Sequence, residues 1–276
     1  MVRRRLDHEL VRRGLASSGE QARALVDDGA VLVNGAPADK PGRLVADDEA
    51  LVVQSPQRFV SRGGEKLDAA LDHFEVVVAG RRALDAGAST GGFTDCLLQR
   101  GALQVVALDV GHGQLHPRLR HDPRVSVLER TNVRTVDTGA VDGPFELVTA
   151  DLSFISLASV APVLAGDLAS PEADVVVLVK PQFEAGRQAV QRGRGVVRDP
   201  DVRRACLEQA ASALTRAEAT IMGAMASPLL GPAGNAEFFL HARAHGLRAT
   251  SHQELSALIA AAVADAPDAG SARGDR

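Results

Sequence analysis

The hydrophobic positions of this chain follow two different patterns, and the change between them falls near residue 55. In the first segment Leu6, Leu10 and Val11 lie at helical spacing, and Gly14 ends the helix that they predict. The apolar residues at positions 22, 25 and 26 predict a second helix, which a serine at position 17 or 18 can cap.

A short β element is predicted after these two helices. Val31 and Val33 alternate with less apolar positions, and Asn34-Gly35 is a dipeptide typical of tight hairpin turns. Residues 47–53 predict a closing strand, and residues 54–57 have the composition of a linker. Residues 1–57 therefore predict a small α+β domain, and we expect residues 58–64 to link it to the rest of the chain.

The second segment, residues 65–266, alternates short apolar runs with helical stretches. The runs are nearly continuous in apolar character, which is typical of parallel strands covered by helices on both faces. The candidate strands are 83–85, 105–109, 125–128, 147–151 and 175–180, with two further strands at 219–226 and 237–241. A last helix is predicted at 253–264, and we expect the polar tail 267–276 to be disordered.

Composition narrows the class of protein. No apolar run approaches the roughly 18 to 20 residues that a membrane span needs, and no apolar core follows the basic N-terminus as in a secretory signal. Cys96 and Cys206 are too few and too far apart to predict a metal site or a disulfide framework. We therefore expect a cytoplasmic protein without a structural metal.

The charged residues give a local signal and no global one. The net charge is −4, so any affinity for nucleic acid has to come from clusters such as Arg4, Arg12 and Arg13. Of the 31 basic residues only three are lysines, at positions 40, 66 and 180. A desolvated lysine can lose its proton and act as a base, which arginine does not do, so these positions are candidates for chemistry.

A glycine-rich loop follows the strand at 83–85. Gly87, Gly91 and Gly92 stand between this strand and a helix, where glycines let a ligand approach the backbone amides. The spacing differs from the Gly-x-Gly-x-x-Gly of dinucleotide sites, so it favours a nucleoside cofactor without a pyrophosphate. Asp109 ends the next strand, where a carboxylate can accept hydrogen bonds from both ribose hydroxyls. The alternative is a tight turn with no ligand.

Four motifs resemble one known family. They are residues 85–93, Asp-Leu-Ser-Phe-Ile-Ser at 151–156, Leu-Val-Lys-Pro-Gln-Phe-Glu at 178–184, and residues 227–237. Together they are similar to the TlyA, or hemolysin A, family of rRNA 2'-O-methyltransferases, whose catalytic half is of the FtsJ type. Residues 29–35 and Lys40-Pro41 resemble the RNA-binding domain named after ribosomal small-subunit protein four. The resemblance runs over nearly the whole chain.

The resemblance implies a doubly wound, Rossmann-like α/β sheet with a final antiparallel strand and a small N-terminal RNA-binding domain. It implies S-adenosylmethionine as methyl donor and cytidines of small- and large-subunit rRNA as acceptors. Asp85 is the candidate for orienting the methionine end of the donor, directly or through water. The expected cofactor contacts are Asp85, Gly87, Ser89, Gly91, Gly92, Phe93, Asp109 and Val110, and the expected RNA contacts are Arg4, Arg12, Arg13, Lys40 and Arg62.

The family's Lys-Asp-Lys-Glu tetrad carries over onto Lys66, Asp151, Lys180 and Glu237. A ribose hydroxyl is a poor nucleophile, so its methylation needs a base or a nearby cation. Lys180 is the candidate for that role, with the two carboxylates orienting the ammonium groups. An ordinary ion pair is the alternative for each residue taken alone. The oligomeric state stays open, with a monomer as the working expectation.

Three other classes of protein are alternatives to an rRNA methyltransferase. A membrane-active, hemolysin-like protein is one, although the sequence lacks a span, a signal and a strongly amphipathic cationic helix. A noncatalytic ribosome-binding factor is the second, and the tetrad and Asp109 argue against it. Pseudouridine synthases also carry the N-terminal domain, but Val45 stands where their catalytic aspartate is expected.

Overall fold

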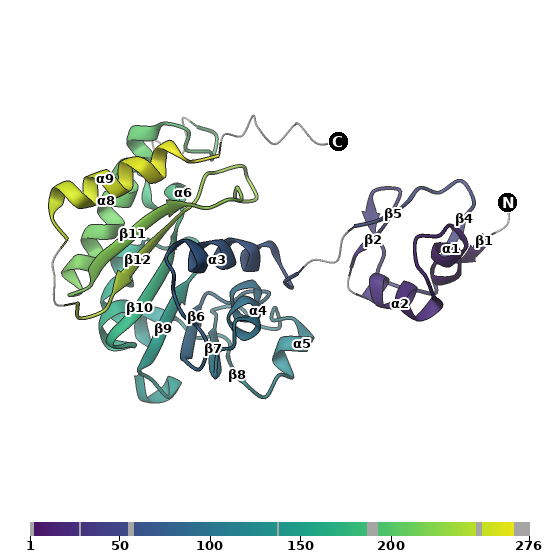
Figure 1. Cartoon of the computed structure of the whole chain (residues 1–276), viewed down its shortest axis with the longest axis horizontal. Coiled ribbons are helices and arrows are strands. Elements are labelled where there is room, and N and C mark those ends of the chain that lie inside the picture. Colours follow the sequence, from purple (N-terminus) through teal and green to yellow (C-terminus); the bar gives the residue numbers. More distant parts are fainter. Residues whose placement is uncertain are drawn as a thin grey trace. The chain divides into compact units, whose positions relative to one another are not determined.

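The computed structural model describes residues 3–27, 29–54, 58–136, 138–186, 193–246 and 250–267. The chain divides into two compact units, Met1–Arg58 and Phe59–Arg276 (Figure 1). No helix in these ranges is both long and apolar enough to cross a membrane. The predicted tail lies outside the described residues from position 268 onward.

The N-terminal unit is a small α+β domain, as predicted. Strand β1 (Arg3–Arg5) pairs with β4 (Leu44–Ala46), and β2 (Val31–Val33) lies between β3 (Ala36–Pro37) and β5 (Leu51–Val53). Helices α1 (Leu6–Arg12) and α2 (Gly19–Asp27) complete it. Asn34 and Gly35, with φ of 52° and 80°, form the predicted turn between β2 and β3. Leu6 and Leu10 are buried, but Val11 is 37% exposed, so its assignment to the apolar face was wrong.

The larger unit is built on a seven-stranded sheet in the order β11-β12-β10-β9-β6-β7-β8. Its strands are β6 (Arg82–Ala86), β7 (Gln104–Leu108), β8 (Val125–Leu128), β9 (Phe145–Ala150), β10 (Ala169–Val179), β11 (Thr220–Ala226) and β12 (Phe238–Arg243). Strand β12 runs antiparallel to both of its neighbours, β10 and β11, and the other pairs described in this sheet are parallel, which confirms the predicted sheet with its final antiparallel strand. Strand β10 begins earlier than its apolar run indicated, because its first residues are partly polar.

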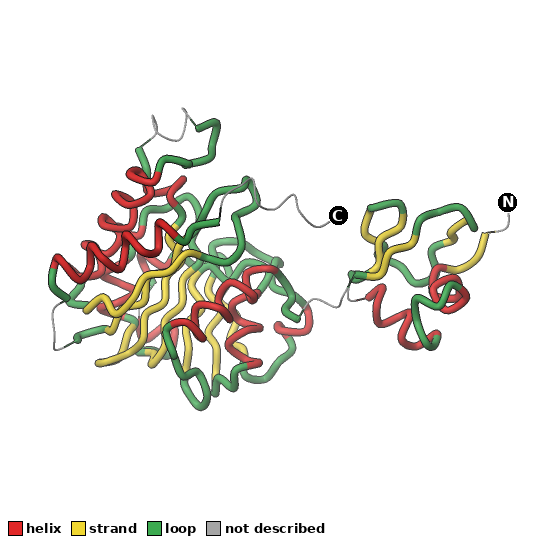
Figure 2. The backbone as a smooth tube through the Cα atoms, turned by 45° about the horizontal axis from the view of Figure 1, so that its top comes forward, coloured by secondary structure: helices red, strands yellow, loops and turns green. Residues whose placement is uncertain are grey.

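Helices cover both faces of this sheet (Figure 2). They are α3 (Arg62–His73), α4 (Gly92–Gln99), α5 (Pro117–Arg120), α6 (Pro181–Glu184), α8 (Pro200–Arg216) and α9 (His252–Ala264), with short helical turns at 133–135, 138–141, 157–159 and 162–167. Side chains of β10 alternate between two cores. Val175, Val177 and Val179 join the core under α8 and α9. Val176 and Leu178 join the core under α3 and α4, so the sheet is doubly wound.

The expected linker at residues 58–64 has a different structure. Phe59 is only 2% exposed and belongs to the core under α3 and α4, and α3 already begins at Arg62. A Cβ at Gly64 would lie 2.3 Å from the Phe59 ring, so the ring packs directly on the start of the helix. The larger unit therefore begins at Phe59, because the aromatic side chain is buried there.

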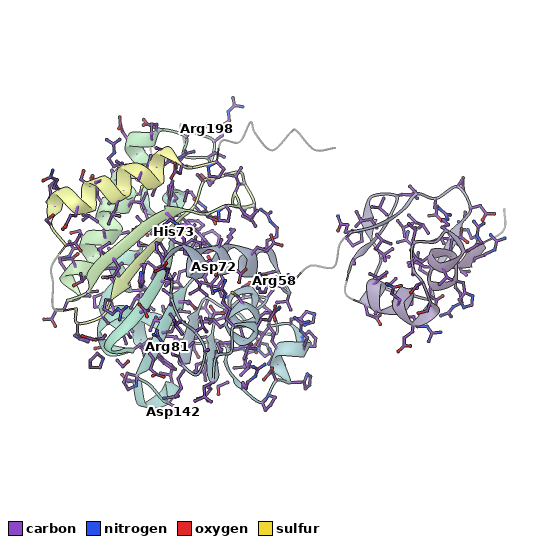
Figure 3. The ribbon with its side chains drawn as sticks, viewed as in Figure 1. Arg58, Asp72, His73, Arg81, Asp142 and Arg198 are labelled. Carbon is purple, nitrogen blue, oxygen red and sulfur yellow. The ribbon has the colours of Figure 1, made fainter. Side chains whose placement is uncertain are left out.

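The carboxyl ends of the parallel strands all lie at one edge of the sheet. Arg81 and Asp142, which come before β6 and β9, mark the opposite, amino edge (Figure 3). Ala86, Leu108 and Ala150 end β6, β7 and β9. The glycine loop, Asp109 and Asp151 follow these three residues, so chain segments distant in sequence meet at the carboxyl edge.

Candidate active site

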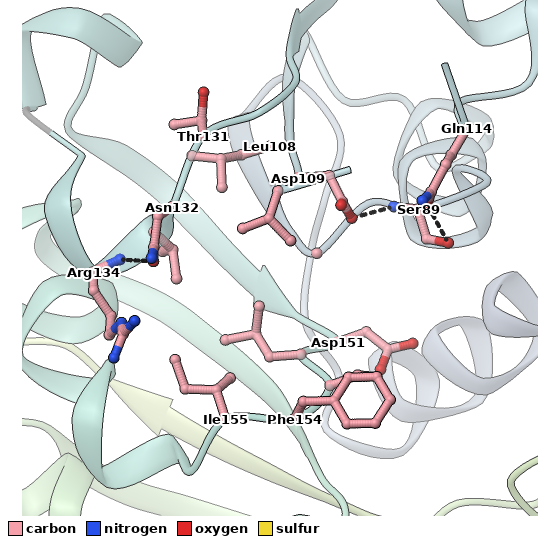
Figure 4. A pocket seen from close by; sticks show the side chains of 15 residues that line it. Ser89, Leu108, Asp109, Gln114, Thr131, Asn132, Arg134, Asp151, Phe154 and Ile155 are labelled. Carbon is pink, nitrogen blue, oxygen red and sulfur yellow. Dashed lines mark hydrogen bonds between the residues drawn. The ribbon is translucent and has the colours of Figure 1, made fainter. Parts of the chain in front are cut away.

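A cavity of about 480 Å³ opens at the carboxyl ends of β6, β7 and β9 (Figure 4). Four of the predicted cofactor residues line it, namely Gly87, Ser89, Asp109 and Val110. The other lining residues are Leu108, Gln114, Thr131, Asn132, Val133, Arg134, Asp151, Leu152, Ser153, Phe154 and Ile155. A cavity that combines apolar walls with convergent polar groups is typical of small-molecule sites.

Backbone geometry explains why a glycine stands at position 87. Its φ is +88°, and a Cβ there would lie 2.6 Å from the carbonyl oxygen of Asp151. Asp109 is oriented from the other side of the cavity, because its Oδ2 accepts a hydrogen bond from the Ser89 amide at 2.8 Å and its Oδ1 one from the Gly111 amide at 2.6 Å. This carboxylate therefore has a defined position at the end of β7.

Asp85 is fully buried and does not line the cavity. Thr94 Oγ1 donates to its Oδ2 at 2.6 Å, and its Oδ1 is a buried oxygen without a hydrogen-bond partner among the described residues. Burial raises the pKa of Asp85 to about 7, the Thr94 hydrogen bond opposes the rise, and the charge of Asp151 adds to it. Any action of Asp85 on a bound ligand has to be indirect.

Three other residues of the predicted cofactor loop serve packing and do not line the cavity. Phe93 is 3% exposed and stacks on Phe239 with ring centroids 6.1 Å apart. A Cβ at Gly91 would collide with Leu119, and one at Gly92 would lie 2.2 Å from Ser61 Oγ. These residues hold the loop in place against neighbouring helices, which the loop sequence alone did not reveal.

One wall of the cavity was not predicted from the sequence. Gln114, Asn132 and Arg134 come from segments after β7 and β8. Asn132 Oδ1 accepts from the Arg134 amide at 3.0 Å and so begins a short helical turn, a capping pattern visible in the sequence. Such a cap predicts a turn but not a cavity, so the sequence held only a partial signal.

The sheet brings three members of the predicted tetrad to its carboxyl edge. Val177 of β10 pairs with Ala150 of β9, so Asp151 follows beside Leu178. Val179 pairs with Phe238 of the antiparallel strand β12. Lys180 and Glu237 are the next residues on either side of that pair and therefore lie at the same end.

The four side chains form two ion pairs. Lys66 Nζ, on α3, donates to Glu237 Oε2 at 2.6 Å, and both side chains are at most 9% exposed. Lys180 Nζ lies 2.5 Å from Asp151 Oδ1 in an ion contact outside hydrogen-bond alignment, and it donates to Ser153 Oγ at 3.0 Å. Because Asp151 also lines the cavity, the second pair stands directly beside it.

An exposed aromatic ring stands next to this ion pair. Phe154 is 90% exposed and has a φ of +64°, an uncommon conformation for a bulky residue. Its ring lies 4.9 Å from that of Phe183, and Lys180 Nζ is 6.0 Å from the Phe183 ring centroid. The ring is therefore not a core side chain.

The arginines expected to contact RNA are joined to carboxylates in the N-terminal unit. Arg12 and Arg13 both donate to the buried Glu9, and the Arg12 hydrogen bond lowers the pKa of Glu9 to about 2 against the effect of burial. Arg4 lies 2.5 Å from Asp47 Oδ1. Arg4 and Arg12 keep 39% and 50% of their side chains exposed, whereas Arg13 keeps 22% and also donates to backbone carbonyls.

The two remaining candidates for RNA contact differ from each other. Lys40 is exposed in the N-terminal unit. Arg62 belongs to α3 of the larger unit, where its Nη2 donates to the Leu230 carbonyl at 2.8 Å. That bond ties the start of α3 to the turn that precedes Glu237.

Family comparisons agree with this division of the chain. Residues 59–244 match the FtsJ-like methyltransferase family, and residues 4–51 match the S4 domain. The chain is 52% identical over 270 residues, 97% of its length, to a Mycobacterium tuberculosis protein matched over 100% of its own length. That relative is named 16S/23S rRNA (cytidine-2'-O)-methyltransferase TlyA.

Two further relatives carry a different name. The chain is 37% identical to Hemolysin A of Brachyspira hyodysenteriae, over 86% of this chain and 98% of the relative. A solved structure of a Streptococcus thermophilus protein, provisionally named a hemolysin, superposes with a TM-score of 0.71 at 37% identity, covering 94% of this chain and 95% of that one.

Proposed function

Because this chain belongs to the TlyA family of FtsJ-like methyltransferases, we propose that it methylates a ribose 2'-hydroxyl of a cytidine in ribosomal RNA. The observation that carries the proposal is the ion pair of Lys180 with Asp151, a residue that also forms part of the cavity wall. A base or cation thereby stands beside the place where a methyl donor would bind.

The residues of the cavity fit S-adenosylmethionine as the donor. Gly87 lets the chain after β9 approach closely and lines the cavity, and the fixed Asp109 carboxylate would accept hydrogen bonds from two ribose hydroxyls. The cavity of about 480 Å³ lies within the usual range for ligands of this size. When bound, S-adenosylmethionine supplies an electrophilic methyl group on a sulfonium.

Lys180 would act on the acceptor hydroxyl. Its ammonium group can stabilise the developing alkoxide, and in its neutral form the amine can accept the hydroxyl proton. Asp151 and Ser153 hold Nζ at the cavity. Lys66 and Glu237 form the second, more buried pair at the same edge, and we assign them to positioning the ribose.

An rRNA substrate would explain why the chain has an N-terminal unit of the S4 type. Its S4 domain would dock on structured RNA through the exposed Lys40 and the half-exposed Arg4 and Arg12, which exchange their carboxylate partners for phosphates. Phe154 would stack on a nucleobase near the target, since an exposed ring offers such a platform. Ribosomal subunits as substrate imply a cytoplasmic location.

In the deciding experiment, the protein and its Lys180→Ala variant are each incubated with tritiated S-adenosylmethionine and unmethylated ribosomal subunits. We expect label on a ribose 2'-oxygen, located by nuclease digestion and mass spectrometry. General base catalysis contributes about two to four powers of ten, so the variant should lose activity by about that factor. Its affinity for S-adenosylhomocysteine should change little.

The outcomes separate the competing functions. If the protein bound the cofactor but transferred no methyl group to either ribosomal subunit, two explanations would remain. It would act as a noncatalytic docking factor, or it would methylate another RNA. A membrane-active protein would instead release dye from liposomes in proportion to dose, and Lys180→Ala would release as much as the unchanged protein.

A further inference from the structure

Glu184 has no role in the reaction described so far, although it ends the helix that begins directly after Lys180. Its carboxylate accepts two hydrogen bonds from another segment. Ser156 Oγ donates to Oε2 at 2.6 Å, and the Leu157 amide donates to Oε1 at 2.8 Å. Hydrogen bonds to an ionised acceptor are about twice as strong as neutral ones, so Glu184 ties α6 firmly to the chain after β9.

The same two segments are joined again at Lys180. Its Nζ contacts Asp151 Oδ1 and Ser153 Oγ, at 2.5 and 3.0 Å. Between these polar contacts the rings of Phe154 and Phe183 pack together, with their centroids 4.9 Å apart. Residues 151–157, hereafter the β9 loop, are thus connected to residues 180–184 at both ends.

The β9 loop contributes both to the wall of the cofactor cavity and to the surroundings of Lys180. Its residues 151–155 line the cavity. On the other side Leu152 and Ile155 pack toward Lys180, Phe183 and Glu184 around a void of about 10 Å³, which is too small to hold a ligand. A shift of the loop would therefore move the cavity wall and the partners of Lys180 together.

This loop needs an external tie. Phe154 adopts a left-handed backbone conformation with its ring 90% exposed, so its own side chain gains little burial to offset the strain. Such a conformation is unfavourable for a bulky residue and persists only where surrounding contacts hold it. The two bonds to Glu184 are contacts of that kind.

We propose that Glu184 is a positioning residue for methyl transfer. Its carboxylate holds the β9 loop so that Asp151 and Ser153 keep Lys180 Nζ at the edge of the cofactor cavity. The inference rests on the proposed function, and it assigns Glu184 no contact with substrate or cofactor. Glu184 acts on the rate through the loop.

The kinetic test compares Glu184→Ala, Glu184→Gln and Ser156→Ala in single-turnover methylation of ribosomal subunits with tritiated S-adenosylmethionine. A displacement of about 1 Å can cost roughly 10²-fold in rate, and we expect a loss of this order in Glu184→Ala. Glu184→Gln keeps the shape and an acceptor for the Leu157 amide, so it should recover most of the rate. Ser156→Ala removes one bond and should lie between them.

Affinity and stability separate positioning from general damage. We expect the affinity of Glu184→Ala for S-adenosylhomocysteine to fall by a smaller factor than its rate. Glu208→Ala, which removes an exposed glutamate from α8, is the matched control and should behave as the unchanged protein. Equal losses of rate and affinity in Glu184→Ala, or no rescue by glutamine, would overturn the proposal.

A readout without RNA keeps this inference separate from the proposed function. The chain contains no tryptophan, so Phe154→Trp places a single fluorophore on the β9 loop. Adding Glu184→Ala should lower its fluorescence anisotropy, and adding Glu208→Ala should not. Unchanged anisotropy would refute the tie even if methylation were lost. If the unchanged protein methylated no RNA, the proposed function would fail. The anisotropy would still decide whether Glu184 holds the β9 loop in place.

Discussion

The Asp85 carboxyl combines a position in the cofactor loop with complete burial. One oxygen accepts the Thr94 hydroxyl, and the other has no partner among the residues described. A charged carboxylate in this position is poorly solvated, so the folded protein binds its proton up to about pH 7. Asp85 is therefore a buried group whose charge changes near neutral pH.

Stability should report this ionisation directly. An unfolded aspartate loses its proton near its ordinary pKa of 3.8, whereas burial raises the pKa of folded Asp85 to about 7. Between these values the folded state binds more protons, so the contribution of Asp85 to the free energy of unfolding falls as pH rises. Asp85→Asn lacks this contribution to the pH dependence. Urea unfolding at about pH 5 and about pH 8 should show that the free energy of unfolding of Asp85→Asn, relative to that of the unchanged protein, is higher at the higher pH.

A parallel pH dependence in the two proteins would contradict this assignment. Thr94→Val serves as a second variant, because it removes the hydroxyl that stabilises the charged form. It should make Asp85 harder to ionise, so the window of falling stability should extend to higher pH.

Among the helices and strands, the contact of α3 with α4 connects the tetrad to the cofactor loop. Lys66 lies on α3, and Gly92 begins α4. A Cβ at position 92 would lie 2.2 Å from Ser61 Oγ and 2.9 Å from the Gly64 amide nitrogen. The two helices can approach this closely only because residue 92 has no side chain.

Gly92→Ala should push α3 away from α4. Overpacking of this kind costs about 1 to 3 kcal/mol, and chemical denaturation would measure it. The displacement should also lower the methylation rate, because Lys66 moves with α3. Gly166→Ala is the control, since a Cβ there meets nothing within 4 Å. Equal stability of the two variants would show that the helix contact is more adaptable than its geometry indicates.

At the scale of the whole molecule, the two units have separate hydrophobic cores. Leu6, Leu10 and Val31 belong to the N-terminal core, and Phe59 and Leu67 belong to a core of the larger unit. Since the cavity and the tetrad lie entirely in the larger unit, cofactor binding and RNA docking are expected to be separable.

Residues 59–276 produced alone should fold and bind S-adenosylhomocysteine, but should not methylate ribosomal subunits. Circular dichroism and calorimetry check the first expectation, and the tritium assay checks the second. The truncation begins at Phe59 because this buried ring is part of the larger unit. Full methylation by the truncated protein would refute the docking role of the S4 domain.

The sequence predicted the arrangement of the sheet well, for a physical reason. Strands buried on both faces are largely apolar, so β6, β7, β9 and β10 were visible as short runs without reference to any partner. The pattern also placed Asp109 and Asp151 at strand ends. It did not predict that residues 59–64 belong to the larger unit, because the burial of Phe59 depends on α3 packing over it.

The local sequence pattern by itself determined the two domains, the succession of strands along the chain and the residue types at the carboxyl edge. These features follow from periodicity and turn chemistry. Family resemblance added the tetrad. Only the tertiary structure decided that Phe93 and Gly92 pack between helices while Asn132 and Arg134 form a cavity wall. It alone paired Glu184 with Ser156. Burial and hydrogen bonding are properties of residues from distant segments taken together, so no single stretch of sequence contains them.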